Sequence, residues 1–107
     1  MFSVRAGPII NDATAEDAKA AGIDRLATII EGTQSPGVIL DEASAEFKRA
    51  YMLADVIIAK GQGNFEALSE QPKSENIFFL LMAKCEIMEE YFHVPVGSAI
   101  LAHWKRV

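Results

Sequence analysis

Residues 55–66 read D-V-I-I-A-K-G-Q-G-N-F-E, and this stretch decides the fold. A short β-branched run over 55–59 is followed at once by a glycine-rich turn and then by the start of a helical pattern at Phe65. Uninterrupted apolarity of this kind is typical of a strand buried on both faces, as in a parallel sheet. We therefore expect a strand, a tight turn and a short helix over about 65–69.

The rest of the chain repeats this alternation. Apolar runs predict further strands over 4–10, 26–30, 77–82 and, at a sheet edge, 98–103, whereas amphipathic patterns predict helices over 15–21, 42–53 and 86–92. Thr14 with Asp17 resembles a capping box ahead of the first of these helices, and Gly22 is placed to end it. Strands alternating with helices predict a three-layer α/β/α, Rossmann-like architecture with a mainly parallel sheet.

Composition narrows the class of protein. Half of the 107 residues are hydrophobic and 23% are charged, which predicts a packed core. The formal net charge of -5, with no Lys/Arg-rich stripe, argues against nucleic acid as a partner. Cys85 is the single cysteine, so no internal disulfide is expected, and the longest apolar run, 77–83, is too short to cross a bilayer. We expect a cytoplasmic protein that does not bind membranes.

An acidic residue follows the first predicted strand. Asn11 and Asp12 stand between that strand and the helix after it. A carboxylate in this position can bind Mg²⁺ or a similar cation and leave ligand positions open for phosphate oxygens and water. The alternative is that Asp12 or Asn11 only caps the following helix.

The turn after residues 55–59 is the more distinctive motif. Gly61 and Gly63 let the backbone approach an anion closely, and the next helix directs its N–H groups to the same place. Lys60 would supply positive charge, and the spacing matches neither a P-loop nor a dinucleotide fingerprint. The alternative is a plain strand-to-helix turn, with Glu66 as a favourable first-turn charge. Since ligands bind beyond the carboxyl ends of parallel strands, Asp12 and this loop are expected at one sheet edge.

The other candidate residues carry weaker signals. The loop over 32–37 forms either a third wall of the site or a flexible connection. His93 and His103 are expected to be surface or structural residues, and Cys85 a small buried hydrophobe. Trp104, near the end of the sequence, is a candidate interface residue.

The motifs together resemble the damage-control phosphatase family, long known as the domain of unknown function 89. The resemblance covers nearly the whole sequence. It is carried by G-P-I-I-N-D-A-T over 7–14, by A-D-V-I-I-A-K-G-Q-G-N-F-E over 54–66, and by F-F-L-L over 78–81 followed by Lys84 and Cys85.

The resemblance implies a metal-dependent phosphatase acting on small phosphorylated metabolites, either sugar phosphates or phosphopantetheine-type compounds. It implies a divalent cation, Mn²⁺, Co²⁺, Ni²⁺ or Mg²⁺, with Asp12 as a ligand and Asn11 in its surroundings. Lys60, Gly61, Gly63 and Asn64 match the loop expected to hold the substrate phosphate.

The sequence departs from the family pattern in one respect. Family members are longer, and an Asp-Asn pair that also binds the cation lies upstream of the segment matched here. Residues 1–107 are therefore expected to be the C-terminal α/β portion of such a domain, with an incomplete metal site. The alternative function is a non-catalytic module that binds an anion or associates with itself. Either a homo-oligomer or the missing N-terminal portion would then cover its exposed apolar surface.

Overall fold

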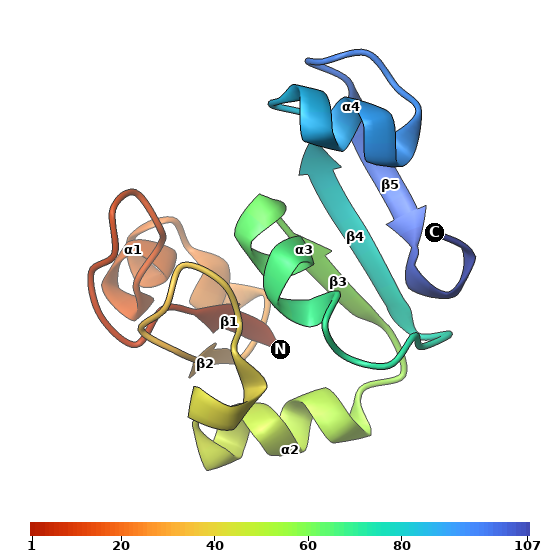
Figure 1. The fold of residues 1–107 in the computed structure, drawn as a ribbon. Coiled ribbons are helices and arrows are strands. Elements are labelled where there is room, and N and C mark those ends of the chain that lie inside the picture. Colours follow the sequence, from red (N-terminus) through yellow and green to blue (C-terminus); the bar gives the residue numbers. More distant parts are fainter. The chain divides into compact units, whose positions relative to one another are not determined.

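The computed structural model describes residues 1–107, and the chain divides into two compact units, Met1–Ala54 and Asp55–Val107 (Figure 1). Each unit contains its own small sheet. The strands of unit 1 (Met1–Ala54) form one parallel pair, and those of unit 2 (Asp55–Val107) form a three-stranded sheet. The mixed α/β fold class predicted from the sequence is confirmed.

Unit 1 packs its helices against a short parallel sheet. Its elements are β1 (Phe2–Val4), α1 (Ala15–Ala20), the 3-10 turn η1 (Ile23–Arg25), β2 (Ile29–Glu31), the 3-10 turn η2 (Leu40–Glu42) and α2 (Ala45–Leu53). Both α1 and α2 contact β2. The buried apolar side chains of this unit are Val4, Ala18, Ile30, Val38, Ala43 and Phe47.

Hydroxyl side chains fix where the two helices of unit 1 begin. Thr14 caps α1, and the reciprocal bond from its backbone N–H to Asp17 completes the predicted capping box. Ser44 caps α2 by accepting the N–H of Phe47 at 3.1 Å, and its own hydroxyl donates to the carbonyl of Glu31 at 2.8 Å. Ser44 therefore sets the start of α2 and ties that helix to the end of β2.

Unit 2 begins with the stretch that decides the fold. Its elements are β3 (Ile57–Lys60), α3 (Gln62–Leu68), β4 (Ile77–Met82), α4 (Glu86–Phe92), β5 (Ala99–His103) and the 3-10 turn η3 (Trp104–Arg106). The strand order is β3-β4-β5, with β3 parallel to β4 and β5 antiparallel at the edge. Figure 1 shows α3 lying against β3 and β4.

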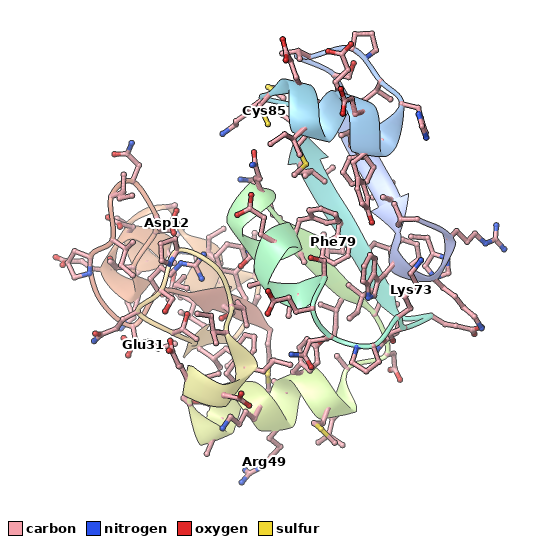
Figure 2. The ribbon with its side chains drawn as sticks, viewed as in Figure 1. Asp12, Glu31, Arg49, Lys73, Phe79 and Cys85 are labelled. Atoms are coloured by element: carbon pink, nitrogen blue, oxygen red, sulfur yellow. The ribbon has the colours of Figure 1, made fainter.

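An aromatic cluster forms the core of unit 2. Phe79, labelled in Figure 2, lies on β4 and is fully buried. It meets Phe65 of α3 edge to face, with ring centroids 5.0 Å apart. Trp104 packs on Phe79 in the same manner at 5.4 Å and is itself buried. Edge-to-face contacts of this kind add about 0.5–1.5 kcal/mol each to the burial of the rings. Trp104, a candidate interface residue from the sequence, therefore belongs to the core of its unit.

Two strand predictions need correction. β1 ends at Val4, and the predicted strand does not continue to residue 10: Pro8 removes a backbone donor, and Ile10 adopts a φ of +46°. The second strand starts at Ile29, three residues later than predicted, because Leu26 ends η1 and is exposed.

The expectation of strands buried on both faces is wrong for the described residues. Val56 and Ile58 around the start of β3 are largely exposed, and alternate residues of β4 are exposed as well. Within unit 2, α3 and η3 pack on one face of the sheet, where Phe65 and Trp104 contact Phe79. None of the helices has the length and apolarity that a membrane crossing would need.

Candidate functional site

Asp12 lies on a turn of unit 1 between β1 and α1. Its backbone N–H donates to the carbonyl of Ile9 at 2.8 Å, and Ile10 inside the turn has a positive φ of 46°. The carboxylate therefore follows a turn, whereas the sequence predicted that it directly follows a strand. Asn11, its predicted neighbour at the site, is exposed.

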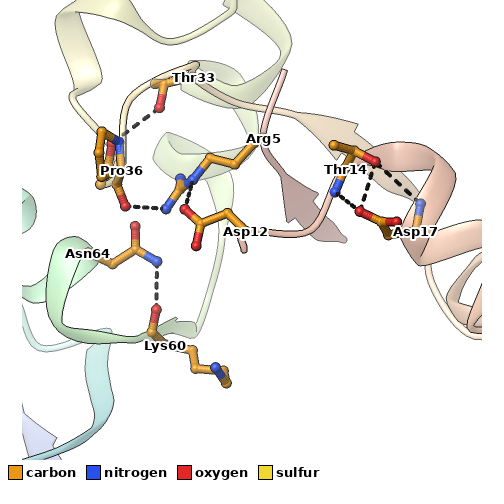
Figure 3. A network of polar contacts seen from close by, with 9 residues as sticks. Arg5, Asp12, Thr14, Asp17, Thr33, Pro36, Lys60 and Asn64 are labelled. Carbon is orange, nitrogen blue, oxygen red and sulfur yellow. Dashed lines mark hydrogen bonds and ion pairs between the residues drawn. The ribbon is translucent and has the colours of Figure 1, made fainter. Parts of the chain in front are cut away.

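The partner of Asp12 is Arg5, which sequence reasoning did not single out. The Nε of Arg5 donates to Oδ2 of Asp12 at 2.8 Å, and its Nη2 donates to the carbonyl of Pro36 at 2.6 Å (Figure 3). The Arg5 side chain is only 12% exposed, whereas that of Asp12 is 41% exposed. The guanidinium thus holds one oxygen of a carboxylate that still reaches solvent.

The loop over 32–37 is held against the same arginine. Besides the bond from Arg5 to Pro36, the hydroxyl of Thr33 donates to the carbonyl of Gly37 at 3.2 Å, and Thr33 is buried. The backbone N–H of Ala6 donates to the carbonyl of Thr33 at 3.0 Å. These contacts agree better with a loop that forms a wall beside Asp12 than with a flexible connection.

Asp12 is not the residue that caps α1, which was the alternative role considered for it. Thr14 occupies the N-cap of α1, and Asp17 accepts from its backbone and hydroxyl. These two bonds, the backbone one first, hold the pKa of the Asp17 carboxyl below its usual range. Asp12 therefore does not cap the helix, and its carboxylate instead accepts a hydrogen bond from Arg5.

The glycine-rich turn of unit 2 joins β3 to α3. Gly61 is the N-cap of α3 and has φ 95° and ψ 155°, a conformation that only glycine adopts readily. A Cβ at this position would meet no atom within 4 Å, so the backbone here has open space beside it. Lys60, the last residue of β3, is exposed. The helix begins three residues earlier than predicted, which places Glu66 beyond its first turn.

Internal hydrogen bonds shape this turn. The N–H of Gly61 donates to the carbonyl of Leu80 at 2.9 Å, and the side-chain amide of Asn64 donates to the carbonyl of Lys60 at 2.7 Å (Figure 3). The N–H groups of Gln62 and Gly63 lie in the first turn of α3, where a helix offers no partner of its own. Gly61 therefore gives the turn its backbone conformation. The N–H groups that could donate to a bound anion belong to the residues after it.

The described residues do not by themselves fit a complete cation site. A divalent cation needs several oxygen or nitrogen ligands, and no group of three or more His, Cys, Asp or Glu side chains gathers in a way that could hold one. Asp12 can provide one carboxylate ligand. The expectation that Asp12 and the turn at Lys60 share one sheet edge concerns residues of two different units and stays a prediction.

The remaining candidate residues, two histidines and the cysteine, occupy structural positions in unit 2. His103 stacks on Phe78, with ring centroids 4.8 Å apart, and one of its ring nitrogens lies 2.8 Å from the carbonyl oxygen of Glu75. His93 ends α4 in a left-handed conformation. Cys85 is the N-cap of α4 and is partly exposed, so it is not the buried hydrophobe expected.

Comparison with known proteins places the chain in a family. A family model described as the damage-control phosphatase ARMT1-like domain matches residues 1–100. A damage-control phosphatase of Pyrococcus horikoshii is 55% identical over 95 residues, which cover 88% of this chain and 33% of that protein. A damage-control phosphatase of Archaeoglobus fulgidus is 42% identical, covering 91% of this chain and 34% of that protein.

The fold agrees with a solved relative. The crystal structure of a DUF89 family protein from Pyrococcus horikoshii superposes with a TM-score of 0.87 and 48% identity, covering 95% of this chain and 36% of that one. The chain thus spans about one third of the length of these relatives. With the match over residues 1–100, the chain belongs to the damage-control phosphatase ARMT1-like domain family.

Proposed function

We propose that the chain forms part of the site of a metal-dependent phosphatase that hydrolyses small phosphorylated metabolites, either sugar phosphates or phosphopantetheine-type compounds. The names of the Pyrococcus and Archaeoglobus relatives support the reaction class. The observation that carries the proposal for this chain is the Asp12 carboxylate, held at one oxygen by Arg5 and still open to solvent.

Asp12 is proposed as one ligand of the divalent cation, Mn²⁺, Co²⁺, Ni²⁺ or Mg²⁺, with Asn11 beside it. Carboxylate oxygen suits the harder ions of this set. One carboxylate does not hold such a cation, so the remaining ligands belong to the part of the family domain outside these residues. The ion pair with Arg5 would keep the carboxylate oriented before a cation arrives.

The turn after β3 is proposed to bind the substrate phosphate. Lys60 would neutralise phosphate charge, and the N–H groups of Gln62 and Gly63 would donate to phosphate oxygens. The positive φ of Gly61 favours a residue without a side chain, so no side chain at this position would block the approach of a phosphate. The hydrogen bond from the Asn64 amide to the Lys60 carbonyl closes the turn. Donors fixed in place before the substrate binds stabilise charge in a phosphoryl-transfer transition state without reorganisation.

A segment exchange tests the proposal. The chain replaces the matching segment of the Pyrococcus phosphatase, and phosphate release is measured on a panel of sugar phosphates and phosphopantetheine with each of the four metals. We expect metal-dependent turnover. Asp12→Asn should lower the rate by about 100-fold or more, as loss of a charge that stabilises the transition state commonly does.

Asp24→Asn is the matched control, because Asp24 is an exposed aspartate of the same unit that lies outside the proposed site. It should leave the rate unchanged. A folded exchange protein that releases no phosphate from any substrate of the panel, or an Asp12→Asn variant with full activity, would contradict the proposal.

A further inference from the structure

A two-residue turn carries Asp12 in unit 1. Ile9 and Asp12 form an isolated antiparallel bridge, and the N–H of Asp12 donates to the carbonyl of Ile9 at 2.8 Å. Ile10 and Asn11 are therefore the two central residues of a tight hairpin turn. Ile10 has a φ of +46°, whereas Asn11 does not have a positive φ. The conformation of this turn decides where the Asp12 carboxylate lies.

Isoleucine is an unfavourable residue for this backbone conformation. A positive φ at the first central position of a hairpin turn is typical of glycine, because the Cβ of other residues crowds the neighbouring peptide. A β-branched residue with a positive φ is a genuine outlier. The Ile10 side chain is 91% exposed, so packing within unit 1 does not offset this strain. Such strain persists only where neighbouring contacts hold the chain in place.

Arg5 supplies contacts that hold the chain after the turn. Its backbone N–H donates to the carbonyl of Ala13 at 3.0 Å, and its Nε donates to Oδ2 of Asp12 at 2.8 Å. The guanidinium is itself fixed by its bond to the carbonyl of Pro36, on the loop after β2 (Figure 3). Arg5 therefore has little freedom to follow Asp12 if the turn changes its conformation.

We propose that the Arg5–Asp12 pair is a latch, which holds the turn at Ile10 in a conformation that the turn does not keep by itself. Without the pair, Ile10 moves to a negative φ, and the backbone of Asp12 shifts away from the place it has here. Arg5 is then a positioning residue for Asp12, and the strain at Ile10 opposes it. The latch is a property of unit 1 alone, and only its use in catalysis rests on the function proposed for Asp12.

Nuclear magnetic resonance on the chain alone reports the φ of Ile10. A positive φ brings the N–H and Hα protons of one residue close together, so the nuclear Overhauser effect between these two protons is intense. We expect an intense effect at Ile10 in the unchanged chain and a weak one in Arg5→Met. Arg25→Met is the matched control, because it removes an exposed arginine of η1 in the same unit, and it should leave the effect intense.

A second variant breaks the same pair from its other partner. Asp12→Ala should weaken the effect at Ile10 as Arg5→Met does, and it decides the question if Arg5→Met does not fold, which circular dichroism checks. An intense effect at Ile10 in a folded variant of either kind would overturn the latch, because the turn would then keep its conformation without the pair. A weak effect in the unchanged chain would overturn it too, since no strained turn would be there to hold.

The latch also requires that Ile10 and Arg5 are energetically coupled. Ile10→Gly relieves the strain in the unchanged chain, but in an Arg5→Met background the turn has already relaxed. The change that Ile10→Gly makes to the urea midpoint should therefore be more stabilising with Arg5 present than without it. The freedom that glycine adds to the unfolded chain is the same in both backgrounds and cancels in this comparison. Equal changes would show two independent sites, and the proposal would fail.

The segment exchange with the Pyrococcus protein tests what the latch does for the proposed reaction. Arg5→Met should lower the rate of phosphate release by about 10- to 100-fold, as misplacement of a group at the site commonly does. Adding Ile10→Gly should recover part of this loss, because the turn then keeps Asp12 in place without the pair. Adding His93→Gly is the control and should recover nothing, since His93 also has a positive φ but lies outside the proposed site.

The outcomes separate the latch from the proposed function. If Arg5→Met loses activity and Ile10→Gly recovers none of it, Arg5 acts on the reaction in another way, and its positioning role is refuted. An exchange protein that releases no phosphate in any form counts against the proposed function alone. The φ of Ile10 in the chain, with and without the pair, then still decides whether the latch exists.

Discussion

Arg5 and Asp12 form an ion pair in which Nε lies 2.8 Å from Oδ2, and the same guanidinium donates to the carbonyl of Pro36. One side chain thereby joins the end of β1, the turn before α1 and the loop after β2. Arginine suits this position because its planar group presents several donors in a fixed arrangement. The pair gives Asp12 a defined orientation independently of any helix cap.

Replacing Arg5 by Met should destabilise unit 1. The variant loses two charge-assisted hydrogen bonds, but Asp12 is 41% exposed and recovers hydration, so we expect a cost of about 1–2 kcal/mol. Arg5→Lys keeps the positive charge but loses the planar arrangement of several donors. Its stability should therefore lie between that of the unchanged chain and that of Arg5→Met. Urea denaturation followed by circular dichroism measures both. A midpoint unchanged in Arg5→Met would show that the pair does not contribute to the stability of the fold.

The capping box at α1 predicts a dependence of stability on acid. The pKa of Asp17 is lowered in the folded state below its ordinary value of 3.8, so the unfolded state takes up this proton more readily. The stabilisation is present above the ordinary pKa and is lost as the pH falls through the lowered folded-state pKa. Asp17→Asn should flatten this part of the curve of stability against pH, measured by thermal unfolding between neutral and acid pH. Glu16→Gln, next to it but outside the box, serves as the control.

Adjacent leucines of β4 should respond very differently to truncation. Leu81 is 6% exposed and faces the core of unit 2, whereas Leu80 is 41% exposed and faces the other side of the sheet. Leu81→Ala should cost about 2–4 kcal/mol through lost burial and a residual cavity. Leu80→Ala should cost less than about 1 kcal/mol in the chain alone, since little burial is lost. Equal losses in denaturant titrations would mean that both faces of the sheet are covered.

Local signals predicted several elements of this fold correctly. The predicted bounds of β4 and α4 match the structure, and the box at Thr14 and Asp17 formed as expected. These features depend on residues within a few positions of each other, so the sequence specifies them directly. Gly22, with a φ of +83°, follows α1 for the same local reason.

Features that depend on distant partners were missed. Arg5 sits in an apolar run, and a charged residue there is the one signal that a partner must exist. Its partners, however, stand seven and 31 positions away. The alternating burial along β4 could not be predicted either, because a continuous apolar run indicates burial on both faces of a strand. Ile58 reads as core in the sequence and is exposed among the described residues.

Gly61 tests how far the turn before α3 depends on its backbone. Its φ of 95° and ψ of 155° lie where a side chain is strained, so Gly61→Ala should cost about 1–3 kcal/mol even though a Cβ would meet no atom within 4 Å. Gly22→Asn is the control, since the left-handed conformation of Gly22 is one that Asn tolerates. Thermal unfolding should separate the two variants, with Gly61→Ala melting well below Gly22→Asn. Equal melting temperatures would show that the turn relaxes to a conformation open to other residues, and the proposed phosphate loop would then lack a fixed shape.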